Sequence, residues 1–363
     1  MVRVTVPIPG RSPYDVFVGT SSLERLDELL PPLPAASTAF VVADRNVSDR
    51  WFDTVATSLG AIGLAVFLLS VPTGEDAKSL HVYEALLHQL ATQEAHRDDP
   101  IVALGGGAVG DLAGFVAATY MRGVPFIQLP TTLTAQVDAA IGGKTAVNLP
   151  EGKNLVGTFS QPLVVVADVA TLGTLPDRDF RSGLAEVAKY ALTLDPELLA
   201  LLEGDPSPIL AREPDALEEL VARCVAAKAG TVAEDERDVG RRLILNYGHT
   251  IGHAVERLDA FAGRSHGEAV ALGMVAAARI AEARGLAPDG LASRTVRLLA
   301  SLGLETDGSL PDTAAIIAAI RLDKKYRGGV RFVLLEDAGR PVVVEDVSDD
   351  EVRKVLEDMG AKP

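Results

Sequence analysis

The sequence contains a single cysteine, Cys224, among its 363 residues. An intramolecular disulfide is therefore excluded, and this usage suits a reducing compartment, so we expect a cytoplasmic protein. The N-terminal segment MVRVTVPIPG lacks the apolar core of a signal peptide. The longest apolar runs, such as residues 64–71, are far too short to span a bilayer. We therefore expect no membrane partner.

Positive charge is also scarce, because 34 lysines and arginines stand against 50 acidic residues and leave a net charge of −16. This balance argues against nucleic acid or an anionic membrane as a partner. An anionic substrate would need a locally basic site. The remaining composition, 48% hydrophobic and 23% charged, is that of an ordinary globular protein. The length allows two domains, each with its own core.

Strand-like and helix-like segments alternate up to residue 168, which predicts an α/β fold with a parallel sheet covered on both faces. The first two strand-like runs, residues 2–8 and 14–18, are interrupted by prolines and are expected at sheet edges. Residues 22–30 are expected to form a helix capped by Ser21 or Ser22. Beyond residues 171–176 the pattern turns helical, with a hairpin at residues 330–344. We therefore expect a Rossmann-like domain at 1–175 and a mainly α-helical domain at 176–363.

A glycine-rich turn lies between an apolar run at 101–104 and a helical pattern at 111–120. Its residues Gly105, Gly106 and Gly107 could let the backbone approach a phosphate at the helix start. The match to G-x-G-x-x-G is weak alone, and a tight packing turn is the alternative. No carboxylate stands about 20 residues further on, where a dinucleotide fold places one. Asp44, at the end of the strand at 39–43, is a better candidate for holding a ribose hydroxyl.

Polar residues gather again between residues 122 and 154. Thr131 and Thr132 offer two hydroxyls after the strand at 125–129, and several charged or amide side chains follow among glycines: Asp138, Lys144, Lys153 and Asn154. Lysines on glycine-rich loops are poor core residues and good partners for anions. We favour an anion site here over a solvated loop.

Three of the six histidines, His249, His253 and His266, fall within 18 residues. Imidazoles are ligands of Zn²⁺, usually with a carboxylate completing a catalytic set. His249 and His253 are one helical turn apart, but the glutamate of an H-E-x-x-H protease motif is missing between them. Glu186, in an otherwise apolar helix, is a possible carboxylate ligand. Its neighbour Lys189, one turn on, leaves a simple buried ion pair as the alternative.

Several motifs occur in order along the chain: GGGAVGDLAGF, RGVPFIQLPTTLTAQVDAAIGGKTAVN, GKNLVGTF, GLAEVAKYAL, LNYGHTIGHAVE, HGEAVALGM and DKKYRGGVRFVLL. With them nearly the whole chain resembles the 3-dehydroquinate synthase family of the shikimate pathway, which leads to the aromatic amino acids. The resemblance implies a homodimeric phosphorus–oxygen lyase that uses NAD and a divalent metal, zinc or cobalt. It also implies an anionic sugar phosphate, 3-deoxy-D-arabino-heptulosonate 7-phosphate, as substrate.

The resemblance assigns Glu186, His249 and His266 to the metal and leaves His253 as an acid–base group beside the substrate. Further residues around the substrate are expected to be Arg122 of a neighbouring subunit, Asp138, Lys144, Asn154, Lys189, Lys228, Arg242, Asn246 and one of Lys324 and Lys325. Cofactor-binding residues are expected to be Asp44, Glu75, Lys78, Gly105, Gly106, Gly107, Asp111, Thr131, Thr132, Lys153, Thr171 and Thr174. Without the resemblance, Glu75 and Lys78 would be interpreted as a capping turn with a surface ion pair, and Arg241 remains a solvated charge.

Two positions depart from the family pattern: Ala146 stands where glycine is frequent, and Asp238 stands where glutamate is usual. The second leaves any acid–base role of Asp238 open. The nearest alternatives are other sugar-phosphate cyclases. Those that make valiolone-type rings differ at the positions of Lys228, Asn246 and His253, so these three favour dehydroquinate. An NAD- and metal-dependent polyol dehydrogenase is the alternative from another class.

Overall fold

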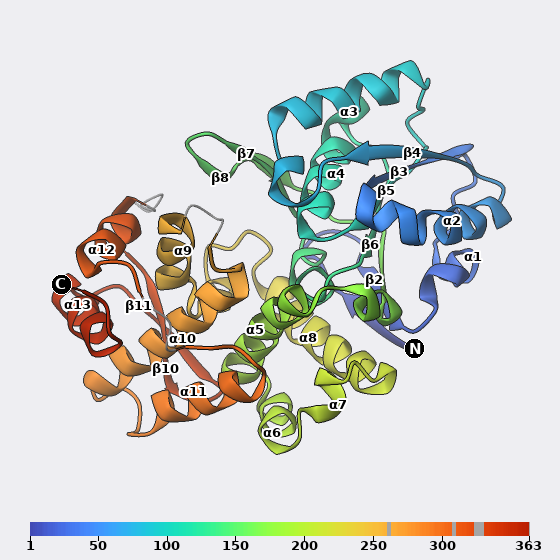
Figure 1. Ribbon diagram of the computed structural model, residues 1–363. Helices are drawn as coiled ribbons and strands as arrows, with labels where there is room; N and C mark the ends of the chain where they lie inside the picture. Colours follow the sequence, from blue (N-terminus) through green and yellow to red (C-terminus); the bar gives the residue numbers. More distant parts are fainter. Residues whose placement is uncertain (260–262, 307–309, 323–329, 363) are drawn as a thin grey trace. The chain divides into compact units, whose positions relative to one another are not determined.

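The computed structural model describes residues 1–259, 263–306, 310–322 and 330–362 (Figure 1). Its contacts divide the chain into unit 1, Met1–Leu175 with Arg212–Arg237, and unit 2, Pro176–Ala211 with Asp238–Pro363. From the sequence, a single domain boundary after residue 175 was expected. Helix α8 (Pro214–Glu234) packs instead on the first two strands of unit 1, where its Leu217 and Leu220 are buried.

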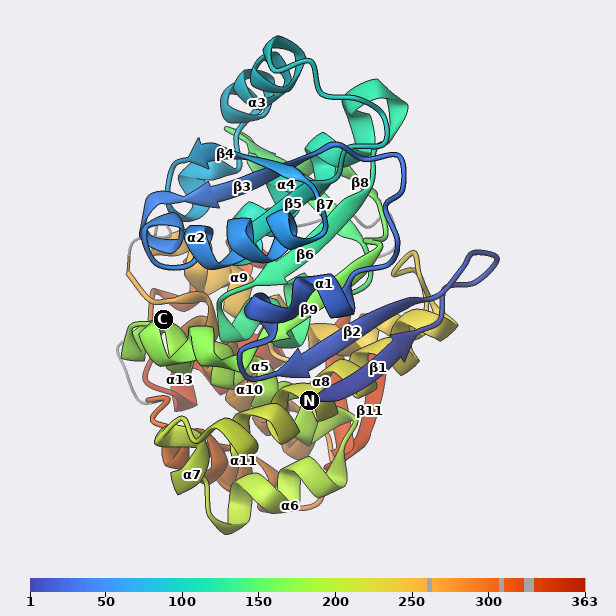
Figure 2. The ribbon, with the colours of Figure 1, turned by 90° about the vertical axis from the view of Figure 1, so that its right-hand side faces the viewer.

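Unit 1 is built on a seven-stranded sheet in the order β1-β2-β9-β6-β5-β3-β4 (Figure 2). Its strands are β1 (Val2–Val6), β2 (Tyr14–Gly19), β3 (Thr38–Asp44), β4 (Ala65–Val71), β5 (Ile101–Gly105), β6 (Phe126–Pro130) and β9 (Val164–Asp168). All pairs are parallel except β1 with β2. The expected α/β fold is therefore confirmed. Only β1 and β4 are edges, so the expectation that β2 lies at an edge is wrong.

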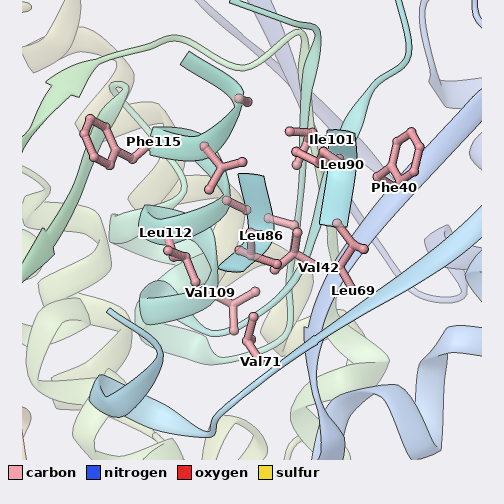
Figure 3. Packing of buried hydrophobic residues seen from close by; sticks show 14 of the residues in the cluster. Phe40, Val42, Leu69, Val71, Leu86, Leu90, Ile101, Val109, Leu112 and Phe115 are labelled. Carbon is pink, nitrogen blue, oxygen red and sulfur yellow. The ribbon is translucent and has the colours of Figure 1, made fainter. Parts of the chain in front are cut away.

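Alternate residues of the central strands enter two separate cores, as a sheet buried on both faces requires. Helices α3 (Leu80–Thr92) and α4 (Gly107–Thr119) cover one face, where Phe40, Val42 and Ile101 pack beneath them (Figure 3). Helices α1 (Leu26–Leu29) and α2 (Arg45–Ala61) cover the other face, over Val41 and Val102. The strand ends beside α4 are thereby held in a rigid frame.

Local structure differs from expectation in two places in unit 1. The segment at 22–30 is a 3₁₀ turn, η1 (Ser22–Arg25), followed by α1, and the Ser21 side chain does not cap it. The glycine- and lysine-rich segment expected to be a loop forms an antiparallel hairpin of β7 (Lys144–Leu149) and β8 (Gly152–Phe159). Gly157 permits the hairpin, since a Cβ there would overlap the carbonyl of Thr145.

Unit 2 is mainly helical, which confirms the second part of the expected fold. Its helices are α5 (Asp177–Thr193), α6 (Pro196–Gly204), α7 (Ser207–Leu210), α9 (His249–Leu258), α10 (His266–Ala283), α11 (Leu291–Ser301), α12 (Thr313–Leu322) and α13 (Asp349–Asp358). The expected hairpin is present as β10 (Phe332–Asp337) and β11 (Arg340–Val344). Among the described residues, no helix combines the length and apolar character needed to cross a bilayer.

Candidate functional site

Glu186, His249 and His266 converge within unit 2, on helices α5, α9 and α10. Glu186 Oε1 lies 3.4 Å from His249 Nε2 and 3.2 Å from His266 Nε2. One carboxylate oxygen and two imidazole nitrogens therefore point at a common position, and this donor set suits Zn²⁺ or Co²⁺. His266 is the first residue of α10.

Glycines bring these three helices close enough for their ligands to meet. The first turn of α10 lies on α5, where Gly267 N–H donates to Ser182 Oγ at 2.9 Å. A Cβ on Gly267 would overlap the Ser182 carbonyl. Further along, α10 passes α9 at Gly273, where a Cβ would overlap the carbonyl of Gly248. The positive φ of Gly248, 79°, lets the chain turn into α9 just before His249.

Glu186 does form the buried ion pair with Lys189 that was considered as its alternative interpretation, but only through one of its two carboxylate oxygens, Oε2. Both residues are 1% exposed, and Lys189 Nζ donates to Glu186 Oε2. Burial alone would raise the pKa of Glu186, but the ammonium of Lys189 and the imidazole of His249 outweigh it and lower that pKa well below its usual value. The carboxylate is therefore ionised, and Oε1 faces the two imidazoles.

Each of the two imidazoles has a hydrogen-bond partner behind it. His249 Nδ1 lies 3.0 Å from the carbonyl of Tyr247, and His266 Nδ1 lies 3.2 Å from Glu256 Oε2. Burial disfavours the charged form of His266, yet its hydrogen bonds to the two glutamates prevail and raise its pKa to about 10. Sequence reasoning missed Glu256, although its position seven residues after His249 puts both on one face of α9.

His253 lies beside this centre and outside the buried triad. Its ring centroid is 5.1 Å from that of His249 and 5.9 Å from that of His266, and the residue is exposed. His253, Glu256 and His266 form a second group whose ligand atoms lie within 4.8 Å of one another. The structure thus brings His253 to the metal centre, as expected, and its acid–base role stays a prediction.

The glycine turn of unit 1 forms the start of α4, with Gly106 as N-cap and no side chain capping it. The backbone is crowded: a Cβ on Gly105 would meet Val109, and one on Gly106 would meet Thr132. Because no side chain caps the 13-residue helix, the N–H groups of its first turn are available to a phosphate, as binding of a dinucleotide requires. Within the described ranges, the buried Thr131 Oγ1 has no hydrogen-bond partner. The residues present fit a nucleotide.

Lys78 does not form the surface ion pair with Glu75 that was considered as its alternative interpretation. Its side chain is buried, and Nζ lies 2.6 Å from both Asp111 Oδ2 and Asn154 Oδ1. Glu75 accepts instead from Asn148 Nδ2 at 2.8 Å. Lys78 therefore joins α4 to the hairpin, and the surface ion pair with Glu75 is wrong.

Four other expected cofactor residues have local hydrogen bonds. Asp44 Oδ1 accepts from two N–H groups at the start of α2. Thr132 Oγ1 accepts from the N–H of Ala135 at 3.2 Å. Thr171 and Thr174 lie in the turn η5 (Val169–Thr174), and their hydroxyls donate to backbone carbonyls. These bonds account for the local structure, and binding of cofactor by the four residues stays a prediction.

The expected anion-binding residues of unit 1 lie on the two strands of the hairpin and on helix α8. Lys144 begins β7, and Lys153 and Asn154 lie on β8, with Lys144 and Asn154 exposed. Lys228, buried on α8, donates to Asp138 Oδ1 at 2.8 Å and to the Asp138 carbonyl at 2.6 Å. Lysines from the hairpin and from α8 therefore belong to the same compact unit.

Other expected substrate residues lie in unit 2 or on the surface of unit 1. Arg242 is 1% exposed and Asn246 half-buried on the turn η6 (Arg241–Asn246), whereas Arg241 is exposed. Asp238 adopts a positive φ of 59°. Arg122, in η3 (Tyr120–Arg122) of unit 1, is exposed with a φ of 68°. Lys324 and Lys325 lie outside the described residues.

Comparison with known proteins agrees with this geometry. A model of the 3-dehydroquinate synthase N-terminal region matches residues 68–182, and a model of the C-terminal region of the same enzyme matches residues 183–326. The 3-dehydroquinate synthase of Symbiobacterium thermophilum is 46% identical over 96% of this chain and 98% of its own. That of Geobacter metallireducens is 45% identical over 93% of this chain and 94% of its own.

Solved structures of related cyclases have the same fold. A 2-deoxy-scyllo-inosose synthase in complex with carbaglucose-6-phosphate, NAD⁺ and Co²⁺ has a TM-score of 0.89 at 30% identity, covering 98% of this chain and 100% of its own. The 2-epi-5-epi-valiolone synthase of Streptomyces hygroscopicus, with NAD⁺ and Zn²⁺, has a TM-score of 0.88 at 28% identity over 98% and 99%. With both family models matched along most of its length, the chain belongs to the 3-dehydroquinate synthase family.

Proposed function

We propose that this protein is a 3-dehydroquinate synthase, which converts 3-deoxy-D-arabino-heptulosonate 7-phosphate into 3-dehydroquinate and phosphate. The observation that carries the proposal is the convergence of Glu186, His249 and His266 in a chain of this family. The reaction eliminates phosphate and closes a carbocycle without net oxidation. The protein is then a phosphorus–oxygen lyase of aromatic amino acid biosynthesis.

Two bound groups supply chemistry that the side chains lack. When bound, NAD⁺ would supply reversible hydride acceptance and a divalent metal would supply polarisation of a hydroxyl oxygen. The start of α4 and Thr131 would hold the dinucleotide, with Asp44 at its ribose. Glu186, His249 and His266 would hold the metal.

The remaining residues bind the substrate or move protons. Lys144, Asn154 and Arg242 would bind its carboxylate and phosphate, because ammonium, amide and guanidinium groups donate to anionic oxygens. His253, beside the metal ligands, would carry a proton to or from the reacting ring. Lys228 and Asn246 would orient the ring, in line with their absence from valiolone-type cyclases.

We further propose a cytoplasmic homodimer in which Arg122 reaches the partner's site. The exposed position of Arg122 on a strained turn supports this role, since left-handed backbone at a non-glycine residue is retained where function needs it. Sedimentation of the purified protein tests the dimer. Mixing Arg122→Ala subunits with subunits inactivated at His253 tests the shared site, since active mixed dimers are expected.

The function is tested by incubating the protein with the heptulosonate phosphate, NAD⁺ and Co²⁺ or Zn²⁺. Release of phosphate in step with formation of 3-dehydroquinate is expected. Glucose 6-phosphate, the sugar whose carba analogue occupies the neighbouring synthase, serves as the rival substrate. Turnover of that sugar alone would contradict the proposal and favour another cyclase. His266→Ala is the inactive control.

A further inference from the structure

Glu256 stands behind the metal centre and has no place in the triad. It lies on α9, seven residues after His249, so both side chains project from one face of the helix. The residue is buried, 8% exposed, and its Oε2 is 3.2 Å from His266 Nδ1. The other nitrogen of the same ring, Nε2, is 3.2 Å from Glu186 Oε1. His266 therefore bridges two carboxylates through its two ring nitrogens.

The chemistry of imidazole makes this bridge directional. A ring nitrogen binds a metal through its lone pair, and in a neutral ring the proton is then on the other nitrogen. An ionised carboxylate only accepts hydrogen bonds, so Glu256 holds the proton of His266 on Nδ1. His249 is oriented in the same sense, with Nδ1 directed at the Tyr247 carbonyl. The group behind His266 is thus a carboxylate that carries a negative charge, whereas the group behind His249 is a neutral carbonyl.

We propose that Glu256 is a positioning residue for the metal, which fixes the tautomer of His266 and makes Nε2 a stronger donor. The inference rests on the metal site of the proposed function. The start of α10 supports it, because the N-terminus of a helix favours nearby carboxylates and His266 is the first residue of that helix. A hydrogen-bonded carboxylate behind a ligating histidine is a recurring device for tuning metal affinity.

The second group of possible ligands, His253, Glu256 and His266, offers the competing interpretation that Glu256 binds the metal itself. Burial argues against it. Glu186 and His249 are buried, and Lys189 donates to Oε2 of Glu186 while Oε1 faces the two imidazoles, whereas His253 is exposed. A metal in the second group would also need the Nδ1 lone pair of His266 and would leave Glu186 unused.

Metal affinity measured with a competing chromophoric chelator tests the proposal on the full chain, with Co²⁺ and Zn²⁺ as probes. Glu256→Ala should weaken binding by about 10- to 100-fold. Glu256→Gln should weaken it less, because its amide oxygen still accepts from Nδ1–H. The visible spectrum of bound Co²⁺ should shift in Glu256→Ala. Glu345→Ala, which removes an exposed carboxylate of the same unit, is the matched control and should bind as the wild type does.

Four outcomes would overturn the proposal. Glu256→Ala with wild-type affinity would show that the contact does not act on the metal. Complete loss of metal, equal to that of His266→Ala while the melting temperature of the metal-free protein is unchanged, would make Glu256 a ligand. A wild-type protein that binds neither metal would overturn the metal site of the proposed function as well. Retention of metal by Glu186→Ala beside its loss from His253→Ala would likewise favour the second group.

Discussion

His253 and Lys144 are both exposed polar residues expected at the substrate, but they occupy different settings. His253 is one helical turn after the metal ligand His249, with its ring against those of the ligands. Lys144 begins a hairpin strand in unit 1. Because one residue would move a proton and the other would bind an anion, their removal should affect different kinetic constants.

For His253→Ala we expect turnover to fall by about 10²- to 10⁴-fold, the usual effect of losing a general acid or base. Metal content and substrate affinity should stay near those of the wild type. His88→Ala, at an exposed position of α3, is the control and should leave turnover unchanged. Metal lost from His253→Ala would instead identify His253 as a ligand.

For Lys144→Ala we expect a rise in KM of about 10- to 100-fold, in line with the roughly 1.5–3 kcal/mol of a hydrogen bond to a charged group. Metal content should not change. Lys354→Ala removes an exposed lysine from unit 2 and should have no such effect. An unchanged KM for Lys144→Ala would place the phosphate or carboxylate elsewhere.

Lys78 provides a prediction about stability. Lys78→Met would leave the partly buried carboxylate of Asp111 without its ammonium partner. We expect a loss of about 2–3 kcal/mol, below the full cost for a completely buried pair because Asp111 retains some exposure. Adding Asp111→Asn should recover part of the melting temperature, since the two effects are coupled. Additive losses in the double variant would contradict this account.

At the scale of elements, the sequence pattern predicted the strands and helices of the parallel sheet well, because buried strands and amphipathic helices differ in their periodicity. The β7–β8 hairpin was missed because its strands carry glycines and exposed polar residues, which read as a loop. The packing of helix α8 on unit 1 depends on contacts that no local pattern encodes.

In the candidate site, too, local sequence patterns predict some features and not those that depend on contacts between distant residues. The triad could be assigned only through the family resemblance, since spacing alone left Glu186 as a possible ion pair. Glu256 was missed because its partner His266 is on another helix, ten residues further along the chain. Contacts between helices, unlike the capping and periodicity within one helix, have no signal in a single sequence.

The crossing of α9 and α10 gives the prediction that belongs to this scale. Gly273→Ala would place a methyl group on the Gly248 carbonyl and push the helices apart. We expect a loss of about 1–3 kcal/mol or more from overpacking, together with weaker metal binding. Gly204→Ala, at the end of α6 with open space around it, is the control and should not lower the melting temperature. Full metal affinity in Gly273→Ala would mean that the site does not depend on this crossing.

At the scale of the whole molecule, a chain of net charge −16 would have to bind the anionic substrate of the proposed reaction. The lysines of the β7–β8 hairpin, Lys144 and Lys153, supply positive charge in unit 1, whereas the charge of Lys228 on α8 is balanced by Asp138. The net charge repels an anion at long range and salt screens this repulsion, so substrate capture should not slow as ionic strength rises moderately. Recognition then comes from short-range contacts, which suits a small metabolite better than a polymer.

The last prediction concerns the two groups that the proposed reaction requires, a dinucleotide and a divalent metal. Because the hydride removed is returned to the same molecule, one NAD⁺ should serve many turnovers, and the NADH absorbance band should not grow as phosphate is released. Protein stripped of metal by a chelator should release no phosphate, and Co²⁺ or Zn²⁺ should restore it. One NADH formed for each substrate consumed would instead identify a polyol dehydrogenase.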